Sequence, residues 1–214
     1  MITEVEEFIK GVRAYREQEE RDAVYKISIY LVSQLFTENK DEEIEGRRKI
    51  EWIADAVGTL LLVWNNAFYR YGPLDFHRLQ EAIEQHYDRL LCFRNRSIES
   101  FQENENDEQE VREIFSSFEE ATVRRNKDGN EMRTPVGTVK ALHILAPNFF
   151  PLWDQKIARA YGYTSLNADN YISFMKEVKD LLTEVRRWEL PPDIQPTLKS
   201  IDEFNFAKYT KNWI

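Results

Sequence analysis

The sequence has few of the residues that metal sites, disulfide frameworks and nucleotide-binding loops require. Among its 214 residues are one cysteine, three histidines and seven glycines. The single cysteine, Cys92, cannot form an internal disulfide, and no Cys/His cluster has zinc-site spacing. The glycines are scattered singly, which excludes Walker and dinucleotide-binding loops. We therefore expect no metal and no cofactor, and we expect Cys92, in the apolar run 90–93, to pack in the core.

Long apolar runs and an excess of positive charge are also missing. The richest apolar run, residues 57–64, is far shorter than the roughly 20 residues that span a bilayer. The acidic N-terminus lacks the features of a secretory signal, so we expect a soluble, cytoplasmic protein without membrane contact. The net charge of −9 argues against broad phosphate-driven binding of nucleic acid. A local basic patch remains compatible with the cations of the middle segment: Arg94, Arg96, Arg124, Arg125, Lys127 and Arg133.

What the sequence does contain is helical periodicity along most of its length. Apolar residues recur every three or four positions, and neither an alternating strand pattern nor an internal repeat is found. Residues 126–130 predict a turn, because Asp-Gly and Gly-Asn tolerate positive φ. We predict an all-α fold of about eight to ten helices. Residues 1–214 form one domain, or two lobes in which N- and C-terminal helices pack around a central segment, 50–163.

Helix starts are indicated by short polar side chains that stand just before apolar periodic runs. Asp75 is predicted to cap the helix that follows it, Asp107 to cap a helix over 108–125, and Asn167 or Asp169 to start a later one. The aromatic tail, 196–214, is predicted to pack on the body of the protein.

Residues 134–163 carry the densest set of functional signals. Residues 135–137 (Pro-Val-Gly) predict a turn, the following helix carries Lys140, and Asp154 stands where the next helix begins. Asp154 is either an ordinary helix cap or a cap that also takes part in chemistry. Lys140 is either a solvated helical lysine or a nucleophile. Trp153 is first a core aromatic and otherwise part of a base pocket.

The order of these features resembles the helix-hairpin-helix DNA glycosylases, the superfamily that includes endonuclease III and the 8-oxoguanine DNA glycosylases. Their signature is a Leu-Pro-Gly-Val-Gly hairpin, a helix that carries a catalytic lysine in the lyase members, and a Val-Asp-x-x-Val-x-Arg segment with the catalytic aspartate. Here Gly137 matches the hairpin, Lys140 the lysine helix, and Asp154 and Arg159 the aspartate segment.

Two upstream segments fall in the same order. Residues 62–70, with Asn65 and Asn66, are similar to the asparagine-containing helix of the 8-oxoguanine enzymes, and residues 91–96, with Arg94 and Arg96, to their Gly-Tyr-Arg-x-Arg turn. The resemblance covers residues 57–163.

The sequence departs from the family pattern at four places. One hairpin glycine is absent, Lys140 follows Gly137 by three positions instead of two, and Lys140 and Asp154 stand closer together than in familiar members. Leu152 and Trp153 replace the small apolar pair before the aspartate.

The resemblance implies a helix-hairpin-helix-like element around residues 108–163 and a DNA base-excision glycosylase acting on a modified base, with or without AP-lyase activity. Lys140 would be the Schiff-base nucleophile and Asp154 its electrostatic partner. The implied substrate- or DNA-binding residues are Asn65, Asn66, Arg94, Arg96, Gly137, Trp153 and Arg159.

The residue types suit this chemistry. Cleavage of a nucleoside C–N bond builds positive charge on the sugar, which a carboxylate near C1′ stabilises, and an uncharged lysine amine can attack that carbon. The target base must also leave the duplex to be reached. The alternative hypothesis, which the negative net charge and the missing glycine favour, is a non-catalytic helical interaction or scaffold protein of unknown partner.

Overall fold

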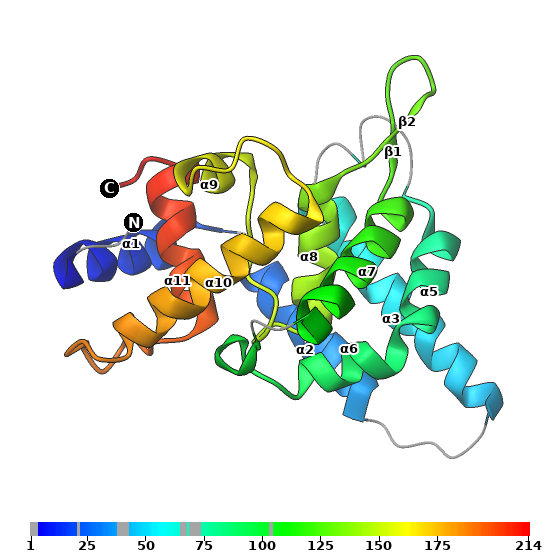
Figure 1. The fold of residues 1–214 in the computed structure, drawn as a ribbon, viewed down its shortest axis with the longest axis horizontal. Helices are drawn as coiled ribbons and strands as arrows, with labels where there is room; N and C mark the ends of the chain where they lie inside the picture. Colours follow the sequence, from blue (N-terminus) through cyan, green and yellow to red (C-terminus); the bar gives the residue numbers. More distant parts are fainter. Residues whose placement is uncertain (1–3, 21, 38–42, 65–67, 69–73, 103–104) are drawn as a thin grey trace.

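The computed structural model describes residues 4–20, 22–37, 43–64, 68, 74–102 and 105–214. Within these ranges most of the chain is helical, which confirms the predicted all-α class (Figure 1). The helices are α1 (Val5–Gln18), α2 (Asp22–Thr37), α3 (Glu43–Trp64), α5 (Phe76–Gln85), α6 (Tyr87–Arg94), the 3₁₀ helix η1 (Ile98–Ser100), α7 (Glu105–Ala121), α8 (Pro135–Leu145), α9 (Gln155–Ala160), α10 (Ala168–Val185), α11 (Leu198–Asn205) and the π-helix η2 (Phe206–Thr210).

A small β-hairpin, for which the sequence has no alternating pattern, joins α7 to α8. Strands β1 (Arg124–Arg125) and β2 (Glu131–Met132) pair antiparallel. They flank the predicted turn at 126–130, in which Gly129 has a φ of 82° and the Asn126 side chain accepts the backbone N–H groups of Asp128 and Asn130. Two-residue strands are too short to show the alternating pattern by which strands are recognised in a sequence.

The predicted helix starts are mostly confirmed. Asp75 caps α5, Asp154 caps α9 and Asn167 caps α10, each with a side-chain oxygen that accepts backbone N–H groups of the first turn. Asp107 is the exception, because α7 begins at Glu105 and therefore already contains it. The aspartate instead accepts hydrogen bonds from the Arg96 guanidinium and from the backbone N–H of Gln102.

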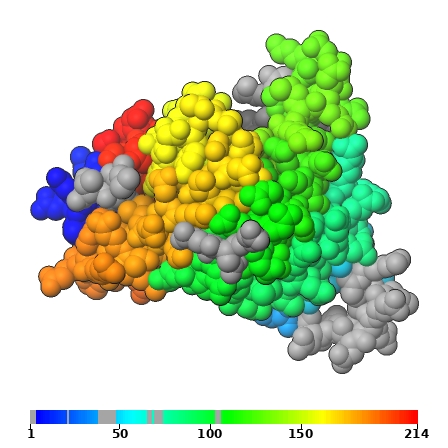
Figure 2. All heavy atoms as spheres, in the orientation of Figure 1, coloured from blue at the N-terminus to red at the C-terminus, as the bar shows by residue number. Residues whose placement is uncertain are grey.

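The helices lie in two groups, seen on the left and right of Figure 1. The left group brings the two ends of the chain together, since α1 packs against α11 and η2, with α9 and α10 beside them. The right group contains α2, α3, α5, α7 and α8. Helix α10 crosses to contact α7, and in space-filling form the two meet directly (Figure 2). The aromatic tail therefore packs on the body, as predicted.

Helix α8 lies inside the right group and is buried along most of its length. All its residues from Gly137 to Leu145 are buried except Lys140, which is half-buried. A helix that is apolar nearly all round requires neighbours on every side, and here they are α2, α3 and α7. Lys140 is the only lysine or arginine of α8.

Cys92 is exposed on α6, which corrects the prediction that it packs in the core. Leu90 and Phe93, both fully buried, occupy the inward face of this short helix and leave position 92 outside. Among the described helices, none is both long and apolar enough to cross a membrane.

Candidate functional site

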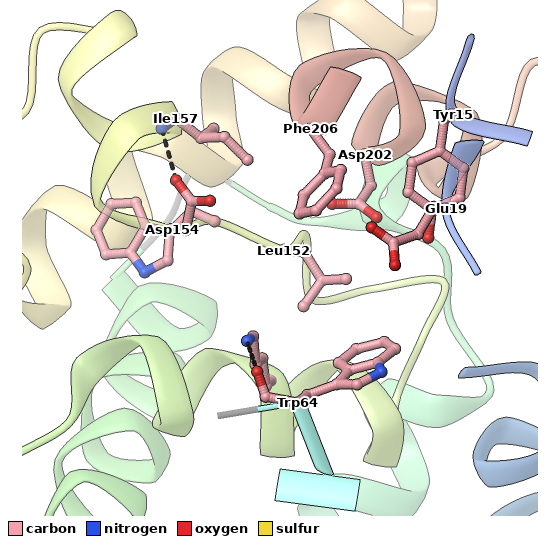
Figure 3. A pocket seen from close by; sticks show the side chains of 10 residues that line it. Tyr15, Glu19, Trp64, Leu152, Asp154, Ile157, Asp202 and Phe206 are labelled. Atoms are coloured by element: carbon pink, nitrogen blue, oxygen red, sulfur yellow. Dashed lines mark hydrogen bonds between the residues drawn. The ribbon is translucent and has the colours of Figure 1, made fainter. Parts of the chain in front are cut away.

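A pocket of about 100 Å³ lies between the two groups of helices (Figure 3). Its wall combines aromatic rings with charged side chains from α1, α3, α8, α9, α11, η2 and the segment before α9. The lining residues are Tyr15, Glu19, Trp64, Lys140, Leu152, Trp153, Asp154, Ile157, Asp202 and Phe206. The two predicted catalytic residues, Lys140 and Asp154, thus line the same pocket although they come from different helices.

Asp154 has a structural role at this site as well as a place in the pocket wall. One carboxylate oxygen, Oδ1, accepts the backbone N–H groups of Lys156 at 2.7 Å and Ile157 at 2.9 Å, which caps α9. The other oxygen, Oδ2, accepts the Thr210 hydroxyl at 2.5 Å. Figure 3 shows the carboxylate turned toward Ile157 at the start of α9. These three donors hold the carboxylate in one orientation, with its charge at the positive end of a short helix.

Lys140 reaches the pocket from α8. Its Nζ donates a hydrogen bond to the carbonyl oxygen of Trp64 at 3.2 Å and lies 5.8 Å from the centre of the Trp64 ring. Trp64 is the last residue of α3, where carbonyl groups lack partners within their own helix. The lysine therefore joins the end of α3 to α8 and carries positive charge to the pocket wall.

Asp202 on α11 is a third charged group in the pocket, and it was not among the predicted site residues. It is 7% exposed, and burial raises the pKa of its carboxyl group. The neighbouring Lys199, whose Nζ lies 3.3 Å from Oδ2, opposes this rise in pKa, as does Lys140, whereas the negative charge of Asp154 adds to it. Asp202 is therefore a buried carboxyl group that shares the pocket with Asp154, whose own carboxylate is held at the N-terminus of α9.

No sequence pattern could have identified Asp202. It stands beside Glu203 among the apolar positions of α11 and looks like any solvated acidic pair on a short helix. Both side chains are buried only because α1 packs across α11. Glu19 and Tyr15 enter the pocket wall through the same packing, which brings residues from the two ends of the chain together.

Behind Asp202 lies a buried cluster around Lys199. The Lys199 Nζ donates to the Tyr15 hydroxyl at 3.0 Å and lies 4.3 Å from the ring centres of both Tyr15 and Tyr25. Burial and the surrounding carboxylates raise the pKa of both tyrosines, so their hydroxyls stay protonated. Glu203, whose pKa burial also raises, pairs with Arg16 at 3.0 Å.

A hydrogen-bonded chain connects the pocket wall to the core of α8. His143 is fully buried, and burial lowers its pKa to about 3, so the ring is neutral near pH 7. Its Nδ1 lies 2.7 Å from the Phe150 carbonyl oxygen and must donate to it, which makes Nε2 the acceptor for the Tyr25 hydroxyl at 2.9 Å. The Tyr25 ring stacks on Trp64 with an interplanar angle of 4°. The position of Trp64 is thereby tied to the core.

Arg94, a predicted DNA contact, is outside the pocket lining and contacts the C-terminal end of α8. Its Nη1 donates to the carbonyl oxygens of Leu145 at 2.6 Å and Ile144 at 3.3 Å, and its guanidinium lies 4.7 Å from the centre of the Phe36 ring. Burial lowers its pKa. A cation at this position satisfies carbonyls that the helix cannot satisfy itself, so the contact explains why an arginine is buried here.

Arg96, the second predicted arginine contact, also lies outside the pocket lining. It forms a 2.6 Å ion pair with Asp107, which raises the pKa of the guanidinium, and donates to the carbonyl oxygen of Ser100 at 2.8 Å. The guanidinium also lies 4.9 Å from the centre of the Phe149 ring. Both arginines therefore make contacts within the protein, Arg94 with main-chain carbonyls and Arg96 with a buried carboxylate.

The remaining predicted site residues lie in different environments. Trp153 lines the pocket and is 1% exposed, whereas Arg159 is exposed on α9. Asn65 and Asn66 lie outside the described residues.

Gly137 does not form the predicted turn, because residues 135–137 are the first turn of α8 and the β-hairpin supplies the connection. A Cβ at Gly137 would lie 2.7 Å from Thr134 Oγ1 and 2.9 Å from the Phe68 ring. Close packing, not a positive φ, therefore requires glycine there.

Within the described ranges, no group of three or more His, Cys, Asp and Glu side chains is arranged to hold a metal ion. Comparison with known proteins adds no relative, since no family model matches the chain and no similar curated protein or solved structure is found.

Proposed function

We propose that the protein is a DNA glycosylase that excises a modified base and that Lys140 gives it an associated AP-lyase activity. One observation carries the proposal. Lys140 and Asp154, the two residues that the glycosylase resemblance assigns to catalysis, line one pocket whose other walls are largely aromatic. An apolar pocket with a few convergent polar groups is the usual form of a small-ligand site.

In the proposed reaction the bond between C1′ and the base nitrogen breaks, and its electron pair goes to the departing base. The sugar becomes positively charged, and the fixed carboxylate of Asp154 stabilises that charge. Lys140 first loses its ammonium proton to water, and the free amine then attacks C1′ and forms a C–N bond. When the bond between C1′ and the ring oxygen breaks, that oxygen takes a proton from the nitrogen and a protonated imine remains. Asp202, whose raised pKa favours the protonated acid, can supply the proton that the base needs as it leaves.

DNA contact is assigned to exposed cations near the pocket instead of to Arg94 and Arg96. Arg159 is exposed and lies on α9, the helix that Asp154 caps. With a net charge of −9, contact to phosphates has to be local, and binding should be weak and strongly dependent on salt.

Borohydride trapping on duplexes that carry single modified bases tests the proposal. The wild-type protein should form a covalent adduct with one of these duplexes and release its base, and Lys140→Gln should abolish the adduct. Lys179→Gln is the matched control, because the Lys179 Nζ also donates to a main-chain carbonyl oxygen, that of Phe101 at 2.9 Å, but lies outside the pocket lining.

Two outcomes would contradict the proposal in different ways. An adduct that persists in Lys140→Gln excludes Lys140 as the nucleophile. If no duplex gives either an adduct or base release, the protein is instead a non-catalytic helical interaction protein.

A further inference from the structure

The carboxyl group of Asp202 presents one oxygen to the pocket. Its Oδ2 accepts a hydrogen bond from Lys199 Nζ at 3.3 Å, whereas no described residue donates to its Oδ1. Within the described ranges, the only fully enclosed side-chain nitrogen and oxygen atoms without a partner are His86 Nε2 and Trp153 Nε1, so Oδ1 is accessible. Figure 3 shows the carboxyl group turned from α11 toward Leu152, into the pocket.

This oxygen is open to a ligand but nearly cut off from bulk water. Asp202 is only 7% exposed, and it lines the pocket. A carboxylate oxygen that has lost most of its water and gained no donor is unfavourable. The position therefore favours a ligand that donates a hydrogen bond to Oδ1.

The charge of the pocket wall favours a ligand that is positively charged. Three carboxyl groups line the pocket, those of Glu19, Asp154 and Asp202, but only one lysine, Lys140, lines it with them. A cation in the pocket reduces the repulsion among these carboxyl groups, whereas an anion adds to it.

Lys199 lies behind Asp202 but does not cancel the excess of negative charge. Its Nζ lies 3.3 Å from Asp202 Oδ2, but also 3.8 Å from Asp22 and 4.0 Å from Glu203. The cations that pair with those two acids are Lys26 and Arg16. Counted together with the pocket wall, five carboxyl groups face four cations among the described residues, which leaves a net charge of −1. One monovalent cation at Oδ1 balances this charge.

The pocket suits an organic cation better than a metal ion. A metal ion needs several ligands that converge on one point, and within the described ranges no three His, Cys, Asp or Glu side chains are arranged in this way. Both oxygens of Asp154 already accept protein donors, from Lys156, Ile157 and Thr210. The rest of the wall favours contact with alkyl groups, because it is formed by the apolar and aromatic side chains of Tyr15, Trp64, Leu152, Trp153, Ile157 and Phe206.

The size of the pocket limits the ligand to a small group. An apolar cavity of roughly 150 Å³ holds benzene, which corresponds to roughly 25 Å³ for each of its carbon atoms. The volume of about 100 Å³ therefore has room for about four non-hydrogen atoms.

We infer that the pocket binds a small alkylammonium group, of about four non-hydrogen atoms, whose N–H donates to Asp202 Oδ1. The alkyl carbons contact the apolar and aromatic wall, and the positive charge balances the excess of carboxyl groups. The same wall would stabilise positive charge on the sugar in the proposed reaction, but binding of a permanent cation requires no catalysis.

Three probes of equal size separate charge from shape. Isopropylammonium, isopropanol and acetate each have about four non-hydrogen atoms, the size that the pocket holds, but the first is a cation, the second is neutral and the third is an anion. Titrations at about pH 8 keep the alkylamine protonated, since its pKa is close to that of lysine, and favour the ionised form of Asp202. Sodium chloride holds the ionic strength constant.

Proton–nitrogen correlation spectra of the full chain measure the binding. Isopropylammonium should shift the signals of residues that line the pocket in a saturable manner, with a Kd in the millimolar range, because so few atoms make contacts. Isopropanol and acetate should bind at least tenfold more weakly.

Two variants locate the contact. Asp202→Asn keeps the shape of the side chain but removes its charge, so it should weaken isopropylammonium binding at least tenfold and leave the weak binding of isopropanol unchanged. Asp55→Asn is the matched control, because it removes the same charge from an exposed position on α3 outside the pocket lining, and it should leave both affinities unchanged.

The inference is overturned if isopropylammonium gives no saturable shift, if it binds no more tightly than isopropanol or acetate, or if it keeps its affinity in Asp202→Asn. The first two results come from the wild-type protein and do not depend on how the variant folds. Binding of isopropylammonium without base release from any duplex would refute only the proposed function, whereas base release without this binding would refute only the inferred cation site.

Discussion

Asp154 caps a helix and lines the pocket, and replacement by asparagine or by alanine separates these two roles. Asparagine keeps a side-chain oxygen that can accept the N–H groups of Lys156 and Ile157, and its amide can still hydrogen-bond to Thr210. Alanine removes all three contacts. Only the carboxylate, however, carries the negative charge that the proposed reaction needs. The two variants should therefore differ in stability but agree in activity.

The expected losses of stability follow from the contacts. Removing an N-cap costs about 1 kcal/mol, and losing the hydrogen bond to Thr210 costs a further 1 kcal/mol or so. Asp154→Ala should thus lower the free energy of unfolding by about 2 kcal/mol, or the melting temperature by roughly 4–8 °C for a chain of this length. Asp154→Asn loses only the charge at the helix N-terminus, which is worth about 0.3–1 kcal/mol.

The expected loss of activity is the same for both variants. Removal of one fixed group that stabilises charge in a transition state typically costs about 100- to 1,000-fold in rate. Base release from a modified duplex should fall by that factor in Asp154→Asn and in Asp154→Ala. Melting curves by circular dichroism and single-turnover base release measure the two effects on the same samples.

Asp75 supplies a matched control for helix capping. Its Oδ1 caps α5 by accepting the N–H groups of His77 at 3.0 Å and Arg78 at 3.1 Å, and it lies outside the pocket lining. Asp75→Ala should lower the melting temperature without changing base release. If Asp154→Asn releases base at the wild-type rate, Asp154 is a helix cap only, and the assignment of its charge to catalysis is refuted.

Four further predictions concern buried and surface charges. Burial lowers the pKa of His143 to about 3, so at this group the unfolded chain binds one more proton than the folded chain between pH 6.5 and 3. The free energy of unfolding should therefore fall by about 1.4 kcal/mol per pH unit on acidification across that window. In urea denaturation, the free energy of unfolding of His143→Asn should depend less steeply on pH than that of the wild type. Burial raises the pKa of Asp202, so the folded state loses stability as the pH rises above the pKa that this group has in the unfolded chain. Asp202→Asn should therefore raise the melting temperature at pH 7 but not in acid. An unchanged melting temperature at pH 7 would contradict this reasoning. Arg96→Met leaves buried Asp107 without its partner and should lower the free energy of unfolding by about 3 kcal/mol, the low end for a buried pair because Arg96 is partly exposed. Arg159→Ala should leave stability unchanged and reduce the slope of log affinity for DNA against log salt by about 0.9 in fluorescence anisotropy titrations.

The helices and their starts are local properties, and the sequence was sufficient to predict them. A three- or four-residue apolar period depends only on which side chains can share a buried face. Asp75, Asp154 and Asn167 were identified as caps because a short polar side chain before such a run has free N–H groups within reach. Asp107 is wrong as a predicted cap because α7 begins at Glu105 and contains it, and its carboxylate accepts hydrogen bonds from Arg96.

Placement in space required the tertiary structure. The exposed position of Cys92 depends on which face of the short helix α6 its neighbours cover, and it contradicts the apolar pattern of residues 90–93. Arg94 belongs to a charged segment in the sequence, yet it is half-buried because its guanidinium donates hydrogen bonds to the carbonyl oxygens of Ile144 and Leu145. Charge in a sequence does not distinguish a solvated arginine from one that satisfies the end of a helix.

The residues of the pocket also divide into those that the sequence identified and those that only the tertiary structure revealed. Lys140 and Asp154 could be singled out in the sequence because both stand within one stretch of chain, residues 134–163, the lysine on an apolar helix and the aspartate at the start of the next helix. Asp202 and Tyr15 reach the pocket only because α11 packs against α1, a contact between the two ends of the chain that no local pattern encodes. The sequence by itself determined the all-α class, the helix caps and two candidate residues. Only the tertiary structure decided that these two residues share one pocket and that Asp202 joins them there, because both properties depend on packing between segments distant in the chain.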